Sequence, residues 1–395
     1  MVSVAQVHGQ VDQRAPSFSF DFGLAVVVSC ILLLGVVMVY SAGIAKGSRE
    51  FALHTAHIVK HGVHVGVGLI AMAMIIRFLR LDWVQAMSGV LLLVGLVLLA
   101  ALFVPGVGME VNGSTRWMQI AGVRLQPAEL IKLLCLMYIA DYYARKQSNV
   151  HLFKVGVLNI GLPILVVCGL LLAQPDFGTT VVILATTGGL MYLAGVRIGY
   201  FIGVFLCIAV AMALIAYLEP YRVDRLMVFQ DPWADPFNKG FQLTQSLMAI
   251  GRGGWLGVGL GNSLQKLNYL PHADNDFLIA IVGEELGSLG IFIVMGLFAL
   301  LLWRAFAIAS TAMQRAQRFN AYLAYGIGLV LTFNAAIHVG VSTGLLPTKG
   351  LNLPLMSSGG SSMVISLACI GLLFAVDKAN RLPVLKRAIP ARGKR

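Results

Sequence analysis

The stretch Asn268-Tyr-Leu-Pro-His-Ala-Asp-Asn-Asp-Phe277 closes a loop of about sixty residues that begins at Glu219 and separates two apolar spans. Loops of this length without regular structure are usually either functional or disordered. This one contains Trp233, Phe237, Trp255 and a run of glycines, whereas disordered segments are poor in aromatic residues. We therefore expect the loop to be folded and functional. Its acids and bases are nearly equal in number, so specific residues rather than bulk charge must carry the function.

The composition of the rest of the chain is that of a membrane protein. Of the 395 residues, 58% are hydrophobic and 12% are charged, and apolar runs long enough to cross a bilayer recur throughout. This excludes a soluble protein with a single core. The formal net charge is +12, but in a membrane protein an excess of Lys and Arg marks cytoplasmic loops and contact with anionic lipid. We expect no nucleic-acid partner.

The fold class predicted from these runs is an all-α polytopic membrane protein with ten transmembrane helices. The predicted spans are residues 21–41, 57–78, 83–105, 127–145, 153–173, 177–196, 198–218, 276–304, 321–343 and 360–379. An even number of spans places both termini on one side of the membrane. Most of the Lys and Arg outside the spans lie on that side, so both termini are predicted to be cytoplasmic.

This topology makes the polar stretch a large extracytoplasmic loop, residues 219–275, between the seventh and eighth spans. The expected organisation is a cytoplasmic leader at 1–20, one transmembrane domain at 21–379 and a basic cytoplasmic tail at 380–395. No repeat of fixed period divides the membrane domain.

Glu129 and Lys132 are the first ionisable pair of interest within a span. They follow Pro127, which suits the first turn of a helix, and a spacing of three places both on one helix face. Charged groups inside spans are costly and are often functional. The alternative is structural: an acid favoured by the helix dipole that cancels the charge of its neighbour. Because the fourth span begins outside, the pair is expected at the depth where Asp276 enters the eighth span.

Asp276 also has two interpretations. An Asp directly before an apolar helix is an ordinary N-cap, and this alone would explain it. If it instead faces a cavity together with Glu129 and Lys132, three charged groups from distant parts of the sequence meet at one site. Glu284 and Glu285 lie deeper in the same span, and since adjacent acids cannot share one helix face, we expect them to bind the span to its neighbours.

Two further outer segments are irregular. Gly251-Arg-Gly-Gly-Trp-Leu-Gly-Val-Gly-Leu-Gly-Asn262 does not follow a strand of a βαβ unit, so it is not a dinucleotide fingerprint, and tight backbone packing against the bilayer surface is predicted. The segment 345–362 is rich in Gly, Ser and Pro. Irregular backbone at membrane depth is tolerated only when it is buried in protein or lines a cavity, and we expect this segment to line one.

Several of these motifs, in this order, resemble those of the SEDS family (shape, elongation, division and sporulation). The motifs are Arg116-Trp117, Gln126-Pro-Ala-Glu-Leu-Ile-Lys132, Gln174-Pro-Asp-Phe-Gly-Thr179, the glycine-rich run from Gln245 to Gly261, Asp276-Phe277 with Gly283-Glu-Glu-Leu-Gly287, and Pro347-Thr-Lys-Gly350 with Gly359-Gly-Ser-Ser362. The resemblance covers essentially the whole chain. Pro347-Thr-Lys-Gly350 is more similar to division members than to elongation members.

The chain departs from the family pattern in three places. The chain has His272-Ala-Asp-Asn-Asp-Phe277 where Glu-Ala-His-Thr-Asp-Phe is common, Ser357-Ser-Gly-Gly360 where Ser-Tyr-Gly-Gly is usual, and His338 where Asn is common. The acid aligned with the family's essential carboxylate is still Asp276.

The resemblance implies a peptidoglycan glycosyltransferase that polymerises lipid II into glycan strands at the outer face of the cytoplasmic membrane during cell division. Inversion at the donor anomeric carbon would release undecaprenyl pyrophosphate. In this interpretation Asp276 is the catalytic general base, and Glu129 and Lys132 assist it. The substrate-binding residues would be Arg116, Trp117, Arg252, Lys349, Ser357 and Ser361.

The resemblance also implies partners, a cofactor question and a location. The expected partners are lipid II and the growing lipid-linked glycan strand, a class B penicillin-binding protein as transpeptidase, and other membrane proteins of the division machinery. No cofactor is certain, but a divalent cation, Mg²⁺ or Mn²⁺, held by Asp276 and Glu129 is one possibility. The expected location is the bacterial inner membrane at the division septum.

Three other functions remain open at this point. A lipid II flippase would also need a polar cavity, but transporters often show inverted repeats, and none is visible here. An elongation-type polymerase of the same family is the second alternative. A scaffold that only recruits division enzymes is the third, and for it Glu129, Lys132 and Asp276 would be dispensable.

Overall fold

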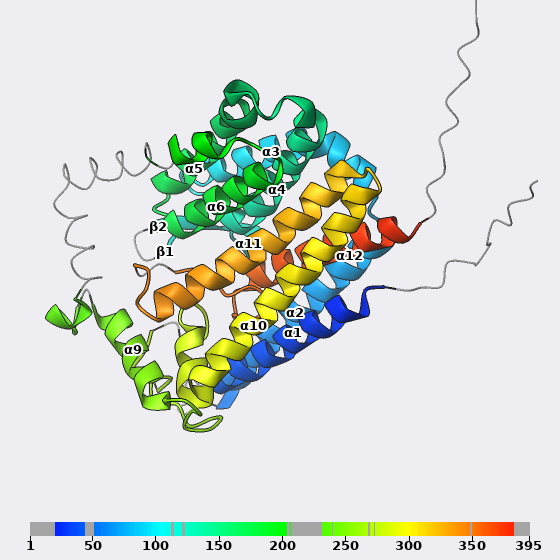
Figure 1. Cartoon of the computed structure of the whole chain (residues 1–395). Coiled ribbons are helices and arrows are strands. Elements are labelled where there is room, and N and C mark those ends of the chain that lie inside the picture. Colours follow the sequence, from blue (N-terminus) through cyan, green and yellow to red (C-terminus); the bar gives the residue numbers. More distant parts are fainter. Residues whose placement is uncertain are drawn as a thin grey trace, which may run out of the picture.

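The computed structural model describes residues 20–43, 51–111, 114–120, 123–203, 206, 231–238, 240–267, 269–271, 273–347 and 350–382. It is a bundle of long helices, with a small sheet and the helix α9 at one end (Figure 1). Both described ends of the chain lie at the other end of the bundle, where the rings of Phe20 and Phe374 meet edge to face at 6.3 Å. The backbone amide of Asp21 also donates to the Asp377 carboxylate at 3.0 Å.

The long helices carry most of the described chain. They are α1 (Phe22–Gly43), α2 (Phe51–Phe78), α3 (Leu81–Ala101), α4 (Pro127–Lys146), α5 (Asn159–Ala173), α6 (Phe177–Leu193), α9 (Phe241–Gly253), α10 (Leu278–Gln314), α11 (Arg318–Ser342) and α12 (Gly360–Arg381). Short turns of helix occur at Gln147–Asn149, Lys154–Leu158 and Pro232–Ala234.

Seven helices in the described part of the chain are long and apolar enough to cross a membrane, which makes this a multi-pass membrane protein. They are α1, the Ile58–Phe78 part of α2, α3, Lys154–Ala173, α10, α11 and α12. The helices α4 and α6 occupy two further predicted spans, and α4 is largely buried among its neighbours. The predicted span 198–218 lies mostly outside the described residues, so the count of ten stays a prediction.

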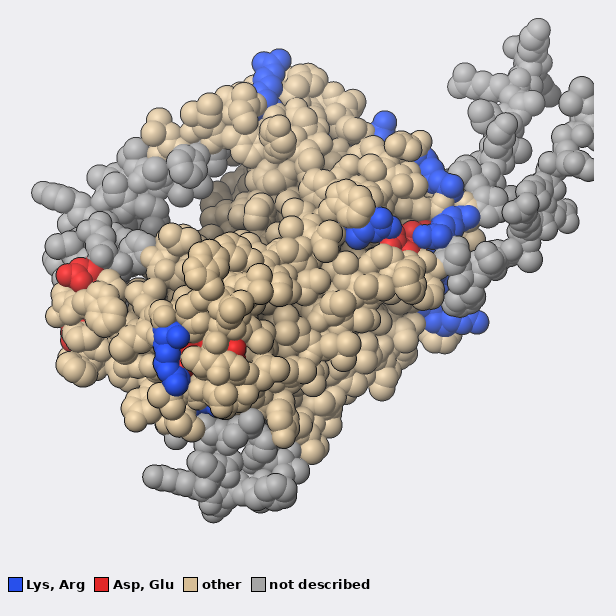
Figure 2. Space-filling model, turned by 60° about the horizontal axis from the view of Figure 1, so that its bottom comes forward, with Lys and Arg blue, Asp and Glu red and all other residues tan. Residues whose placement is uncertain are grey.

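Charge is distributed as a membrane requires. On the face shown in Figure 2, the broad central area carries almost no Lys, Arg, Asp or Glu, and the charged side chains gather toward its edges. Elsewhere on the helix surfaces, apolar side chains such as Leu93, Leu165 and Phe292 are at least 60% exposed. Such extensive apolar exposure is expected of a lipid-facing surface and not of a soluble one.

The prediction of an all-α protein is wrong between α3 and α4, where the chain forms a three-stranded antiparallel sheet. Its strands are β1 (Gly108–Val111), β2 (Ser114–Ile120) and β3 (Val123–Leu125), in the order β1-β2-β3. Val111 pairs with Ser114 across Asn112-Gly113, and Asn-Gly between strands is the strongest short-range signal for a hairpin. The signal was in the sequence, although the two turn residues themselves lie outside the described part.

The glycine-rich run after α9 packs against α10 and not against the bilayer surface. Gly287 interrupts α10 with φ 71°, and the amides of Val258 and Gly259 donate to the carbonyls of Glu284 and Glu285 at 2.9 and 3.1 Å. A Cβ at Gly257 would lie 2.2 Å from the Glu285 carbonyl oxygen, so only glycine allows this approach. The prediction of tight backbone packing is correct, but the run packs against α10 and not, as predicted, against the bilayer surface.

Candidate functional site

The site is built around the bridging segment, by which we mean Gly350–Ser361, which follows α11 and includes the first two residues of α12. Residues 351–357 of this segment are buried although they are not helical. A Cβ at Gly35 of α1 would lie 2.6 Å from Cα of Met356, and Gly35 is thirteen residues along a 22-residue helix. The segment therefore reaches well into the bundle, where irregular backbone must be enclosed by protein.

One half of the bridging segment holds the residues that precede α10. The Ser357 hydroxyl donates to the carbonyl of Asn275 at 2.8 Å and accepts from the amide of Leu353 at 2.9 Å. Ser358 donates from its hydroxyl to the Asp274 carboxylate at 2.8 Å and from its amide to the Asp274 carbonyl at 3.2 Å. The backbone on both sides of Asn275 is thereby fixed.

Asp276 lies next to this anchored backbone and is half-buried. A Cβ at Gly350 would be 2.6 Å from Oδ2 of Asp276, so the carboxylate rests against the start of the bridging segment. The N-cap position of α10 is Phe277, one residue after Asp276.

The other half of the bridging segment reaches the start of α4. The Ser361 hydroxyl accepts from the amide of Gln126 at 3.2 Å and donates to the carbonyl of Arg124 at 3.3 Å. Gln126 is the N-cap residue of α4, so Ser361 positions the helix that carries Glu129 and Lys132. The two regions that the sequence suggested should meet are thus joined to opposite ends of one short segment.

Glu129 and Lys132 form a buried ion pair on α4. Their side chains are 4% and 6% exposed, and Nζ of Lys132 lies 2.9 Å from one Glu129 oxygen and 3.0 Å from the other. Burying a charged lysine is costly unless it is paired with an opposite charge in this way. The pair holds a compact cation in place on the first turns of the helix.

Arg116 joins the sheet to the turn between α5 and α6. Its guanidinium donates to the carbonyls of Gln174 and Pro175 at 3.1 and 2.5 Å. Asp176 follows and caps α6, since its carboxylate accepts from the amide and the hydroxyl of Thr179. Trp117 is half-buried in β2 opposite Met109. The Gln174–Thr179 motif therefore organises the backbone that Arg116 binds.

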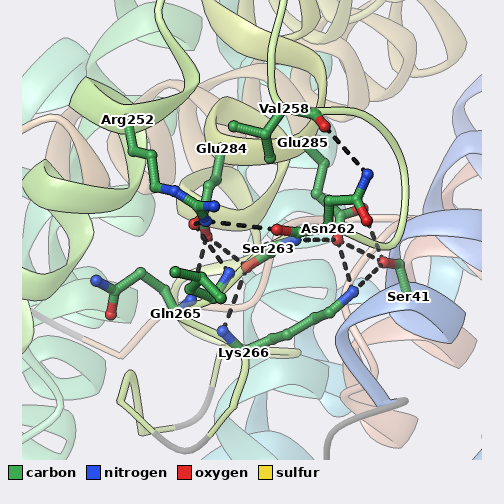
Figure 3. A network of polar contacts seen from close by, with 10 residues as sticks. Ser41, Arg252, Val258, Asn262, Ser263, Gln265, Lys266, Glu284 and Glu285 are labelled. Carbon is green, nitrogen blue, oxygen red and sulfur yellow. Dashed lines mark hydrogen bonds and ion pairs between the residues drawn. The ribbon is translucent and has the colours of Figure 1, made fainter.

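Arg252 belongs to a different cluster, which Figure 3 shows. Its guanidinium lies 2.6 Å from Glu284, whose carboxylate also accepts from the amides of Leu264 and Gln265 at 2.9 and 3.3 Å. Beside it Glu285 accepts from Lys266 at 2.8 Å and from the Ser41 hydroxyl at 2.7 Å.

Both of these glutamates are fully buried. They bind α10 to the loop and to α1, as the sequence analysis expected. The ion pair between Arg252 and Glu284 holds the end of α9 against α10.

Lys349 lies outside the described residues. Its neighbour Gly350 touches Asp276, as noted above. Three buried polar atoms around the site have no hydrogen-bond partner among the residues described: Asn275 Oδ1, Asn352 Oδ1 and Nδ1 of His338. The other ring nitrogen of His338 lies 3.2 Å from the Asn275 carbonyl. Unsatisfied buried polar groups are rare in native structures, so this concentration is typical of a place that binds a polar ligand.

Sequence reasoning missed Asp274, Ser358 and Gly350 as parts of the site. Gly350 contributes by letting the backbone come close to the Asp276 carboxylate, and Ser358 and Asp274 contribute through their hydrogen bond. These contacts join segments that are distant in the sequence, so no local pattern reveals them. The suggestion that Asp276 and Glu129 hold a divalent cation receives no support from the structure. The described residues contain no group of three His, Cys, Asp or Glu side chains placed to hold an ion. The Glu129 carboxylate is bound by Lys132 instead.

Comparison with known proteins decides the family. The model for the family described as "Cell cycle protein", which is defined by FtsW, RodA and SpoVE, matches residues 23–382. The chain belongs to this family. The resemblance to SEDS proteins is thereby confirmed.

Individual relatives agree with this assignment. The probable peptidoglycan glycosyltransferase FtsW of Thioalkalivibrio sulfidiphilus is 47% identical over 373 residues, which are 94% of this chain and 92% of that protein. The corresponding FtsW of Legionella pneumophila is 42% identical over 366 residues and covers 93% of each chain. The division-type motif Pro347-Thr-Lys-Gly350 agrees with these names.

Solved structures of the SEDS family share the fold. A chain from a peptidoglycan synthase complex that coordinates polymerization and crosslinking superposes with a TM-score of 0.75 at 28% identity, over 92% of this chain and 99% of that one. The rod shape determining protein RodA of Thermus thermophilus gives a TM-score of 0.66 at 27% identity, over 93% and 99%.

Proposed function

We propose that this SEDS protein is a peptidoglycan glycosyltransferase that polymerises lipid II at the outer face of the bacterial inner membrane during cell division. The observation that carries the proposal is the bridging segment, which anchors the backbone beside Asp276 at one end and the helix of Glu129 and Lys132 at the other. A half-buried acid and a fixed cation, linked through one segment, suit a reaction in which a hydroxyl attacks and a pyrophosphate leaves.

In the proposed reaction Asp276 is the general base. Its carboxylate takes the proton of the acceptor GlcNAc 4-hydroxyl as that oxygen bonds to the anomeric carbon of the donor MurNAc. The bond from this carbon to the pyrophosphate breaks, the configuration inverts, and undecaprenyl pyrophosphate departs with the electron pair. A base within hydrogen-bond reach contributes on the order of 10² to 10⁴ in rate.

Lys132 stabilises the departing pyrophosphate, and Glu129 orients its ammonium group through the contacts at 2.9 and 3.0 Å. Arg116, whose carbonyl contacts aim it from the sheet, is the second cation, and Lys349 beside Gly350 is the third. Trp117 offers an aromatic face to a sugar. We assign Arg252 to loop positioning because its guanidinium is bound by Glu284.

Ser357 and Ser361 support the substrate indirectly. Both hydroxyls are used within the protein, so we propose that they shape the bridging segment, while Asn275, Asn352 and His338 offer their unpaired atoms to the sugar hydroxyls. No step is routed through a metal ion.

The remaining features of the proposal concern topology and partners. Ten transmembrane helices would place both termini in the cytoplasm and the 219–275 loop outside. The leader at 1–20 and tail at 380–395 would then face the cytoplasm. A class B penicillin-binding protein would crosslink the strands at the septum, together with other division proteins. The peptidoglycan synthase complex among the structural relatives supports such a pairing.

The decisive experiment compares Asp276→Asn and Asp276→Ala with the wild type in a purified complex with the partner transpeptidase, using lipid II and gel analysis of glycan strands. We expect a loss of about 10² to 10⁴ in rate with complex formation intact. Asp82→Asn is the matched control, because Asp82 is 88% exposed at the far end of the bundle. Full polymerisation by both Asp276 variants would refute the general-base role. Protein-dependent scrambling of labelled lipid II without polymer would favour a flippase instead.

A further inference from the structure

A cavity lies at the end of the bundle opposite Asp276, near the last turn of α10. Its volume is about 820 Å³, within the range of small-molecule sites. The walls come from the ends of α2, α3, α4, α11 and α12 and from the turn between α10 and α11, so the cavity occurs where five helices converge. The mechanism proposed above uses none of these residues.

Positive side chains surround this cavity. Arg77, Arg80, Arg318 and Lys378 line it, and Asp82 is the one acid among its described lining residues. Asp82 is 4.0 Å from Arg80 and both are mostly exposed, so the acid neutralises little. Lys378 spends one donor on the carbonyl of Ile76 at 3.0 Å. Four cations from three separate segments therefore converge with a net positive charge.

Two helix starts add to the positive potential. The helices α3 and α11 both begin at the cavity, and neither N-cap residue, Arg80 or Gln317, makes a side-chain capping hydrogen bond. The Gln317 side-chain oxygen instead accepts from Asn320 at 2.8 Å. The first-turn amides of a helix and its dipole favour an anion. They reinforce the cations here and would not make a site alone.

Exposed aromatic residues beside the cavity indicate where the ligand comes from. Phe78, in the cavity wall, is 72% exposed, and Trp83, over whose ring Arg80 lies at 5.8 Å, is 64% exposed. Aromatic rings and Arg at the ends of spans mark the membrane–water boundary. A ligand held here has a charged part among the cations and apolar surface beside it.

We propose that this cavity binds the phosphodiester headgroup of an anionic phospholipid from the adjoining leaflet. Basic pockets between transmembrane helices suit such headgroups. The phosphate would lie among Arg77, Arg80, Arg318 and Lys378, and the acyl chains would extend past Phe78. Because the lipid contacts α2, α3, α11 and α12 at once, it would fasten their ends together.

The test measures retention and competition of phosphatidylglycerol by the full-length protein in detergent, with phosphatidylcholine as the neutral comparison. The variant Arg77→Gln/Arg318→Gln removes two cavity cations. Lys154→Gln/Arg197→Gln is the matched control, since both residues are exposed basic residues outside the cavity and the change in net charge is the same. A cation near an anionic lipid surface is worth about fivefold in affinity, so we expect about a 30-fold loss in the cavity variant and little change in the control.

Two further arms keep the outcome unambiguous. The charge-preserving Arg77→Lys/Arg318→Lys should retain most of the binding, which a misfolded variant would not. Inorganic phosphate at millimolar concentration should fail to displace the lipid. Equal losses in the cavity and control variants, unchanged binding in the cavity variant, or full displacement by phosphate would each overturn the proposal of a lipid headgroup site.

Discussion

Gly35 of α1 touches the backbone of Met356 so closely that a methyl group at this glycine would lie 2.6 Å from the Met356 Cα. The atoms that a Cβ at Gly35 would meet belong to the backbone of the bridging segment and not to a flexible side chain. The bridging segment could therefore make room for a larger side chain only by moving its backbone. The bridging segment can lie this deep in the bundle because residue 35 is glycine and has no side chain.

Gly35→Ala is expected to lower thermal stability and to weaken polymerisation, since overpacking of a filled interior costs about 1–3 kcal/mol. Gly62→Ala is its control, because a Cβ at Gly62 on α2 meets nothing within 4 Å and alanine is the better helix former. Melting in detergent and strand synthesis measure the two effects. Equal melting temperatures for the two variants would contradict the close contact.

Gly350→Ala is expected to separate activity from stability. Its methyl group would press on Oδ2 of Asp276 at 2.6 Å, and a displacement of about 1 Å at a reacting group can cost on the order of 10² in rate. We expect a loss of that size with only a small change in melting temperature. Unaltered rates of lipid II polymerisation would show that Asp276 does not need its present position.

The Glu129–Lys132 pair calls for a double-mutant cycle. Glu129→Gln or Lys132→Met alone leaves an uncompensated buried charge, which costs about 3–5 kcal/mol, whereas the double variant removes both charges and should recover most of the stability. Polymerisation should stay low in the double variant because Lys132 is proposed to stabilise the pyrophosphate. Recovery of activity along with stability would reduce the pair to a structural role.

The two ion pairs that Glu284 and Glu285 form with the loop are expected to differ in their contribution to stability. Lys266→Met leaves the fully buried Glu285 without its charged partner and should lower the free energy of unfolding by about 3–5 kcal/mol. Arg252→Gln should cost less, on the order of 1–2 kcal/mol, because Arg252 is 40% exposed and Glu284 keeps its amide donors. If Arg252 only positions the loop, polymerisation will follow stability in both variants. A severe loss of activity in Arg252→Gln at nearly unchanged melting temperature would instead support substrate contact.

The sequence predicted the parts of the fold that depend on local pattern. Apolar runs located the helices, and Pro127 marked the start of α4. The irregular segment 345–362 was expected to line a cavity; the structure shows that its residues 351–357 are buried, and its lining of a cavity stays a prediction. The hairpin was missed because its short strands are half polar, although Asn112-Gly113 carried the turn signal.

The pairing of distant charges could not be predicted in detail. Glu284 and Glu285 were expected to need partners, but nothing in the sequence assigned Arg252 to one and Lys266 to the other. Ion pairs between segments depend on how the loop folds back, which local pattern does not encode. The same is true of Ser358 and Asp274, which lie 84 positions apart and share a hydrogen bond of 2.8 Å.

At the break in α10 at Gly287, the segment that follows α9 is hydrogen-bonded to the turns on both sides of the break. Ser288 and Leu289 donate to the carbonyls of Gly254 and Trp255, so the loop clasps the helix on both sides of the break. Any displacement of this segment would therefore act on the turns between Asp276 and Gly287 as well as on the remainder of α10.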